Sequence, residues 1–181
     1  LNLQLAFFPR DFYHIDHSDL KIMLSKMDIN PISIHYPSFP SDDVRFIDNL
    51  KMLKDSYGLD IFVVHPKFDK RSDAFDYLES KAEEISSLGV KLAYENIPYP
   101  KNSWVNDIFS LDFGFPFTRL TYDITHLAEE MNEVAEVDGL LDKTSVVHLS
   151  NVKYGEVKKH DHLPIQEGDR DIARFCGYLQ R

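Results

Sequence analysis

The stretch IFVVHPKFDKRSDAFDYLESKAEEISSLGVKLAYE, residues 61–95, decides the fold class of this chain. It opens with an apolar run that ends at His65 and closes with another that ends at Glu95, 30 residues later. Gly89, just before the second run, is a typical helix stop. The residues between the runs include an apolar face at helical spacing: Phe75, Leu78, Ala82, Ile85 and Leu88. A strand, a returning helix and a second strand within about 30 residues indicate a βαβ unit with parallel strands.

The same unit repeats along the chain. Three further short apolar runs end in a polar residue: ISIH at His35, RLTYD at Asp123 and SVVH at His148. From His35 to His148 the five run ends lie 30, 30, 28 and 25 residues apart. Helices are expected near 18–27 with Ser18 as N-cap, from Ser41 to Gly58, over 72–88, 104–111, 127–137 and 171–179.

Apolar strands separated by amphipathic helices predict an α/β fold with a parallel sheet covered by outer helices. An open, doubly wound sheet satisfies this pattern too. However, no strand is followed by GxGxxG or GxxxxGK[ST], and only a barrel naturally brings five consecutive strand ends to one face. The sequence therefore favours a TIM-type (β/α) barrel, with residues 1–181 as a single domain.

Composition narrows the functional classes. A formal net charge of −10 disfavours a large basic surface, which makes nucleic acid an unlikely partner without excluding it. No apolar stretch approaches the ~20 residues that span a bilayer, and no basic segment precedes the first apolar run, so a cytoplasmic protein without membrane contact is expected. The single cysteine, Cys176, excludes a disulfide within the chain.

The strand ends carry groups that bind metal ions. Glu95 and Asp123 end apolar strands, where an unpaired carboxylate is costly, so a cation or a strong donor must lie close to each. With His148 they form a carboxylate and imidazole set that suits Zn²⁺, Mn²⁺ or Co²⁺ better than Ca²⁺, and Mg²⁺ stays open. The alternative is a salt bridge to a lysine or arginine at the same edge of the sheet.

Three histidines are more ambiguous candidates. His126 follows Asp123 by three residues and faces the same pocket if the chain turns out of the strand. There it can bind a second metal or a substrate hydroxyl, or simply begin a helix. His35 and His65 are candidate ligands as well, although histidines at strand ends are often structural or in contact with a substrate.

These residues together resemble a known family, the xylose isomerase-like barrels, which include sugar isomerases and epimerases and enzymes of the endonuclease IV type. The resemblance runs roughly from Leu3 to Phe175 and rests on SIHYP at His35, VVHP at His65, YEN at Glu95, DITH at Asp123 and His126, HLSN at His148, and DHLPIQEGD at His162. It implies that the chain supplies strands two to seven of the barrel and lacks the first and eighth. The family's eighth strand normally brings a glutamate that is both ligand and base, and no carboxylate follows Asp171.

The segment from Lys158 to Asp169 reads as an exposed loop. In the repair enzymes the matching stretch gives an aspartate and a histidine to a third metal, whereas the aligned pair here is His160 and His162. HLPIQEGD is instead similar to a loop of the sugar isomerases, with Gln166 in place of the usual glycine.

Three functions follow from the resemblance. The first is a divalent-metal-dependent isomerase or epimerase of a small sugar, sugar phosphate or related hydroxy-carbonyl compound, acting through a metal-stabilised enediolate. Its catalytic residues are expected to be Glu95, His126 and His162, its metal ligands Glu95, Asp123, His148, His65 and His35. The second is a zinc-dependent phosphodiester hydrolase acting on abasic DNA, and the third a catalytically inactive barrel used for binding. A small polyhydroxylated substrate is the expected partner, and a homo-oligomer is left open.

Overall fold

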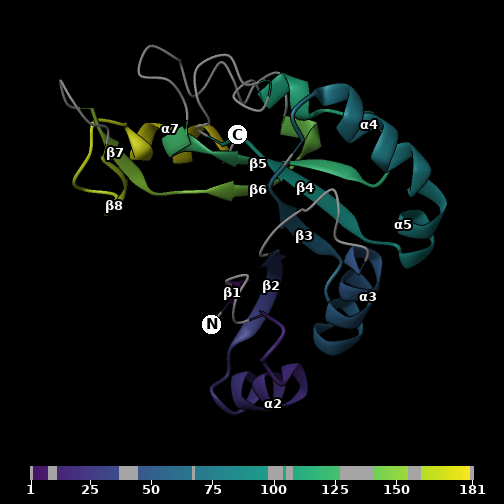
Figure 1. The fold of residues 1–181 in the computed structure, drawn as a ribbon. Coiled ribbons are helices and arrows are strands. Elements are labelled where there is room, and N and C mark those ends of the chain that lie inside the picture. The colour runs from purple at the N-terminus through teal and green to yellow at the C-terminus, as the bar shows by residue number, and fades with distance from the viewer. Residues whose placement is uncertain are drawn as a thin grey trace. The chain divides into compact units, whose positions relative to one another are not determined.

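The computed structural model describes residues 2–7, 12–36, 45–66, 68–97, 104, 108–126, 141–154 and 160–179 (Figure 1). The chain divides into two compact units. The first comprises Leu1–Tyr94 and Phe113–Arg119, and the second comprises Glu95–Asp112 and Leu120–Arg181.

In the described part of the chain, six strands follow one another in the main sheet in the order of the sequence: β1 (Asn2–Ala6), β2 (Asn30–His35), β3 (Ile61–Val64), β4 (Lys91–Glu95), β5 (Thr118–Asp123) and β6 (Thr144–His148). The pairs β1–β2, β2–β3, β3–β4 and β5–β6 are parallel. Sequential parallel strands joined by helical connections are the topology of a (β/α) barrel. The fold class predicted from the sequence is confirmed.

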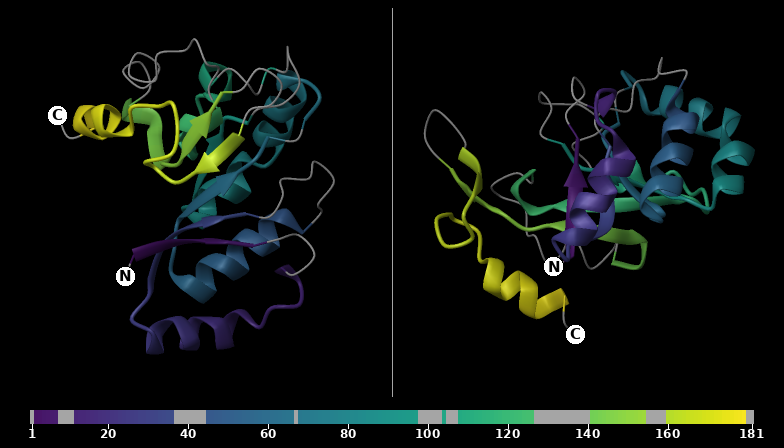
Figure 2. Two further views of the ribbon diagram at one scale, coloured as in Figure 1. Left: turned by 90° about the vertical axis from the view of Figure 1, so that its left-hand side faces the viewer. Right: turned by 90° about the horizontal axis from the view of Figure 1, so that it is seen from below.

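The first unit packs helices against apolar strands. Its helices are α2 (His17–Lys26), α3 (Phe46–Tyr57), α4 (Arg71–Ser80) and α5 (Ala82–Leu88). Figure 2 shows α2 and α3 on the same side of β1 and β2. The fully buried side chains come from both layers: Ile34, Leu50, Leu53, Phe62, Val63, Val64, Leu78, Ile85, Leu92 and Ala93. Each buried leucine or phenylalanine contributes about 1.5–3 kcal/mol, so this interface holds the unit together.

Two glycines end helices in this unit. Gly58 follows α3 with φ +71° and Gly89 follows α5 with φ +64°, both left-handed. A side chain is strained in this backbone conformation, so glycine is the residue that lets the chain turn back toward the next strand.

The second unit contains a two-stranded hairpin and a helix in addition to β6. Strand β7 (Asn151–Lys153) pairs antiparallel with β8 (His160–Leu163), and α7 (Ile172–Leu179) follows. Phe175 of α7 is fully buried and stacks on Tyr122 of β5, with ring centroids 5.7 Å apart. This contact fixes α7 against the strand that ends at Asp123.

Several boundaries differ from those expected. Helix α2 is capped by Asp16, whose carboxylate accepts hydrogen bonds from the amides of Ser18 and Asp19. The helix expected over 72–88 is interrupted at Lys81, a turn that leaves both Leu78 and Ile85 fully buried. The segment expected to be a loop after Lys158 contains β8, because Asn151 and Lys153 of β7 supply a pairing strand.

Other expected helices fall partly or wholly outside the described residues. The segment 127–137 and the proposed cap at Ser41 lie outside them. Of 104–111, the four residues Ile108–Leu111 form a 3-10 helix.

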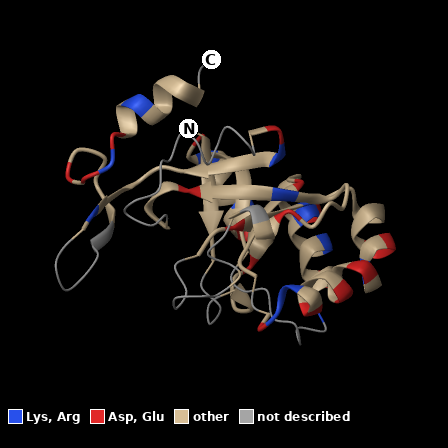
Figure 3. Ribbon diagram, turned by 90° about the horizontal axis from the view of Figure 1, so that it is seen from above, with Lys and Arg blue, Asp and Glu red and all other residues tan. Residues whose placement is uncertain are grey.

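Lys and Arg as well as Asp and Glu occur at several places along the described ribbon (Figure 3). Acidic residues outnumber basic ones in the whole chain, which gives the formal net charge of −10. Among the described helices, none has the length and apolar character needed to cross a bilayer.

Candidate metal centre and active site

The predicted ligands stand at the ends of their strands. Glu95 is the last residue of β4, Asp123 of β5 and His148 of β6. Asp123 is opposite His148 in the parallel register, so the two side chains leave neighbouring strands at the same level. Glu95, Asp123 and His148 all belong to the second unit.

The two carboxylates converge on one imidazole. Nδ1 of His148 is 3.1 Å from Oε1 of Glu95 and 3.6 Å from Oδ2 of Asp123. Glu95 and Asp123 are only 2% and 1% exposed, while the His148 side chain keeps 22% of its surface in solvent. The two carboxylates are therefore buried, and of these three residues only His148 is partly exposed to solvent.

The charges of these three groups shift the pKa values of His148 and Asp123. Burial alone lowers the pKa of His148, but its close contacts with the negatively charged Asp123 and Glu95, including a hydrogen bond to Glu95, outweigh burial and raise the pKa to about 9. Burial raises the pKa of Asp123, yet His148, His126 and the hydrogen bonds from Thr125 together outweigh burial and lower it overall. The imidazolium of His148 therefore neutralises part of the charge that a divalent cation would neutralise.

This arrangement fits a divalent metal. One carboxylate oxygen from Glu95, one from Asp123 and one ring nitrogen of His148 lie within 4.8 Å of one another. Oxygen and nitrogen donors at this spacing can surround one ion with small side-chain adjustments. A histidine nitrogen that has lost its proton carries a lone pair, which is the group that can bind a cation.

His126 lies beside the same carboxylates. It ends the short 3-10 turn Ile124–His126 that follows β5, so the turn expected from the sequence does bring it back toward Asp123. Its Nδ1 is 3.6 Å from Oε1 of Glu95, and its Nε2 is 3.8 Å from Oδ2 of Asp123. Burial lowers the pKa of His126, and the charges of Asp123 and Glu95 only partly oppose this effect, so the ring is neutral near pH 7.

His162 approaches from the hairpin. Its ring meets that of His126 edge to face, with centroids 5.3 Å apart, and its Nδ1 is 3.3 Å from the hydroxyl of Ser150. The residue has φ +55°, a left-handed conformation that is uncommon for a side-chain-bearing residue. Asp123, His126 and His162 form a second group whose potential ligand atoms lie within 4.8 Å of one another.

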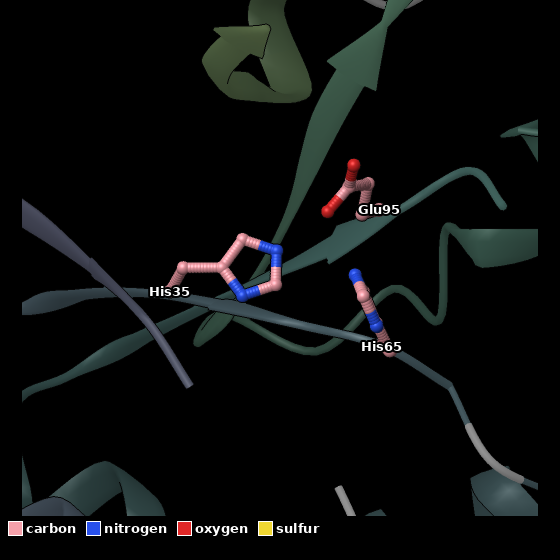
Figure 4. Close-up of side chains that lie close together, drawn as sticks. All are labelled: His35, His65 and Glu95. Atoms are coloured by element: carbon pink, nitrogen blue, oxygen red, sulfur yellow. The ribbon is translucent and has the colours of Figure 1, made fainter. Parts of the chain in front are cut away.

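His35 and His65 form a pair in the first unit. His35 ends β2 and His65 follows β3, and their rings meet edge to face with centroids 4.7 Å apart (Figure 4). Both are half-buried, and Nδ1 of His35 lies 3.3 Å from the carbonyl oxygen of Tyr36. Their role as metal ligands stays a prediction.

The structure adds residues that were not among the predicted ligands or catalytic groups. Thr125 donates both its amide and its hydroxyl hydrogen to Oδ1 of Asp123, at 2.8 and 2.7 Å. Asn96 pairs its side chain with the backbone of Asp123. The sequence offers one weak signal for Thr125, since an aspartate side chain often accepts a hydrogen bond from the backbone amide two residues further on, as in an Asx-turn.

Asn151 holds the segment that follows His162. Its buried side chain donates to the carbonyl oxygens of Ile165 and Arg170 and accepts from the amides of Val152 and Arg170. The amide thereby fixes the chain from the hairpin to the start of α7.

The fixed position of the Asn151 side chain predicts that a small substitution at Gly168 lowers the stability of the protein. A Cβ on Gly168 would lie 2.1 Å from Oδ1 and 2.2 Å from Cγ of Asn151, a side chain that has no room to retreat. We expect Gly168→Ala to lower the free energy of unfolding by about 2–3 kcal/mol, measured by urea denaturation. Gly177→Ala is the control, because nothing lies within 4 Å of its Cβ and alanine favours the helix by up to ~1 kcal/mol. Equal stability of the two variants would contradict the conclusion that the Asn151 side chain is held in place.

Comparisons with known proteins place the fold. No protein-family model matches the sequence, and no curated protein matches it. Solved structures do match, at low identity. A D-tagatose 3-epimerase-like protein has a TM-score of 0.73 at 16% identity, covering 99% of this chain and 77% of its own.

Two further solved structures are similar over nearly the whole chain. A xylose isomerase domain protein from Planctomyces limnophilus has a TM-score of 0.73 at 10% identity and covers 99% of this chain and 75% of its own. A D-allulose 3-epimerase from Methylomonas sp., in complex with D-allulose, has a TM-score of 0.67 at 16% identity, and the match covers 97% of this chain and 68% of the epimerase chain. The chain therefore has the fold of the xylose isomerase-like TIM barrels.

Proposed function

We propose that this protein is a divalent-metal-dependent isomerase or epimerase of a small sugar, sugar phosphate or related hydroxy-carbonyl compound. The observation that carries the proposal is the convergence of the buried Glu95 and Asp123 carboxylates on Nδ1 of His148, at 3.1 and 3.6 Å. The likeness in fold to a D-allulose 3-epimerase supports a small polyhydroxylated substrate.

Glu95, Asp123 and His148 would hold the metal, with Zn²⁺, Mn²⁺, Co²⁺ or Mg²⁺ as candidates. When bound, such a cation supplies a Lewis acid that stabilises negative charge developing on the substrate's carbonyl oxygen. Asp123 contributes Oδ2, because Thr125 occupies its Oδ1. His35 and His65 are proposed as additional ligands.

Glu95 would move the proton. Its carboxylate accepts a proton from the carbon next to the carbonyl, and the electron pair of the broken C–H bond stays with the substrate as the enediolate forms. Return of the proton to the former carbonyl carbon, with transfer of the neighbouring hydroxyl proton to the former carbonyl oxygen, gives the isomer. The epimer forms when a second acid on the opposite side of the enediolate plane delivers a proton to the same carbon, and Glu95 then keeps the proton that it removed. Glu95 suits this role because it is nearly completely buried, so a bound substrate leaves little water beside its carboxylate.

His126 and His162 would orient the substrate. The neutral ring of His126 offers Nε2 as an acceptor for a substrate hydroxyl beside Asp123. His162 is exposed and reaches the same place from the hairpin, so it can contact a small ligand as it binds.

The direct test is exchange of a carbon-bound proton. We expect the protein, loaded with Mn²⁺ or Co²⁺, to exchange the hydrogen on the carbon next to the carbonyl of at least one ketose, D-allulose among them, when incubated in D₂O. Proton NMR would show loss of that signal together with the appearance of an epimer or an aldose. Asp123→Asn is the control that should remove metal binding and exchange together. Absence of exchange across a panel of pentuloses, hexuloses and their phosphates would contradict the proposal.

A hydrolase of abasic DNA is the second candidate, favoured by the second group of ligand atoms at Asp123, His126 and His162. This group would hold an additional ion, as a reaction with two or three zinc ions requires. Metal analysis of the purified protein separates the candidates: one ion per chain supports the isomerase, and two or three zinc ions with cleavage of abasic DNA support the hydrolase.

A further inference from the structure

We propose that Asn96 is the positioning residue of this centre: its side chain fixes the backbone of Asp123, and its main-chain carbonyl fixes the ring of His126. The inference rests on the proposed function for its catalytic meaning, but its geometry involves only Asn96, Asp123 and His126, all in the second unit.

The side chain of Asn96 acts as a strand partner for Asp123. Its Oδ1 accepts a hydrogen bond from the Asp123 amide at 2.8 Å, and its Nδ2 donates to the Asp123 carbonyl oxygen at 3.0 Å. Asn96 is only 1% exposed, so neither bond competes with water. Two bonds from one planar amide to the amide and carbonyl of one residue constrain both the position and the rotation of that peptide.

The main chain of Asn96 selects the tautomer of His126. Nδ1 of His126 lies 2.6 Å from the Asn96 carbonyl oxygen. A carbonyl oxygen can only accept, so Nδ1 carries the hydrogen. In the neutral ring the lone pair is then on Nε2, which lies 3.8 Å from Oδ2 of Asp123.

These two functions of one residue depend on each other. The side chain anchors Asn96 against Asp123, and this anchor keeps the Asn96 carbonyl in place for His126. The residue before Asn96 is Glu95. The hydrogen bonds of Asn96 therefore also hold the proposed base in place relative to Asp123 and His126. An alanine at this position would leave the amide and carbonyl of Asp123 buried without these partners, and an aspartate would keep the acceptor but lose the donor.

The first test needs neither a variant nor a substrate. In metal-free protein labelled with ¹⁵N-histidine, long-range proton–nitrogen NMR spectra at pH 7.5 should show His126 protonated at Nδ1 and unprotonated at Nε2. A hydrogen on Nε2 in the wild-type protein would overturn the proposal. If the Nδ1–H form is found and no ketose is turned over, the proposed function fails while the inference on Asn96 stands.

The second test removes the anchor. Asn96→Ala should lower the affinity for Co²⁺ by roughly 10- to 100-fold, as loss of partners behind metal ligands does. It should also convert part of the His126 population to the Nε2–H form. Asn96→Asp keeps one of the two bonds and should fall between wild type and Asn96→Ala in the fraction of Nδ1–H, which provides a readout if the alanine variant does not fold.

Asn49→Ala is the matched control. Asn49 is also a buried amide, with a hydrogen bond of 2.9 Å to the Tyr36 hydroxyl, but it belongs to the first unit. Its replacement should lower stability without changing the His126 tautomer or the Co²⁺ affinity. Wild-type tautomer and affinity in Asn96→Ala, or the same changes in Asn49→Ala, would assign Asn96 a merely structural role and overturn the proposal.

Discussion

Glu95→Gln is expected to reduce turnover on the order of a thousandfold, because the amide keeps the volume of the side chain but has no basic oxygen to accept a proton. Asp123 stays 3.6 Å from Nδ1 of His148, so the variant should still fold, with a cooperative unfolding transition and the circular dichroism of the wild type. The measurement is the rate of proton exchange on the best ketose of the panel, at saturating metal.

The control for this substitution is Glu84→Gln. Glu84 is exposed on α5, where it makes an ion pair of 2.7 Å with Lys81, and the loss of such a surface pair has little effect on stability. Its turnover should equal that of the wild type. A fully active Glu95→Gln protein would remove Glu95 from the mechanism.

Metal affinity is expected to fall about tenfold for each pH unit below about 9, or roughly a hundredfold between pH 8 and pH 6. The reason is the pKa of His148, raised to about 9: metal binding needs the neutral ring, and below that pKa it must displace a proton. As the pH falls, a smaller fraction of the His148 rings is neutral, so the metal affinity decreases on acidification.

Competition with a chromogenic chelator would measure this slope, and calorimetry in buffers of different ionisation enthalpy should show about one proton released per ion near pH 7. His14→Gln is the control, because His14 is exposed in the first unit. The metal affinity of this variant should depend on pH as it does in the wild-type protein. An affinity that does not vary with pH between 6 and 8 would show that His148 is not a ligand of the ion.

Much of the site was predictable because parallel strands place their last residues at one edge. Glu95, Asp123 and His148 were expected there from the apolar runs that precede them, and the structure brings their ligand atoms within 4.8 Å. His126 was expected to join them if the chain turned after Asp123, and the turn at Ile124–His126 does this. Their role in binding a metal stays a prediction.

The partners of these residues could not be predicted. Nothing in the pattern of the sequence indicates that the side chain of Asn96 pairs with the backbone of Asp123, since the two are 27 residues apart. The hairpin of β7 and β8 was missed for a similar reason: 160–163 is polar and short, and it becomes a strand because Asn151–Lys153 supplies hydrogen-bonding partners.

The sequence by itself determined the order of strands and helices and the residue types at the strand ends, because burial in a parallel sheet requires continuous apolar runs with polar groups only where the strand leaves the core. Only the tertiary structure decided which protonation state each side chain adopts. The pKa of His148 is raised because two buried carboxylates meet it, and the pKa of His126 is lowered because burial outweighs the same charges. That difference depends on distances of a few ångströms between residues far apart in the chain, which no local pattern encodes.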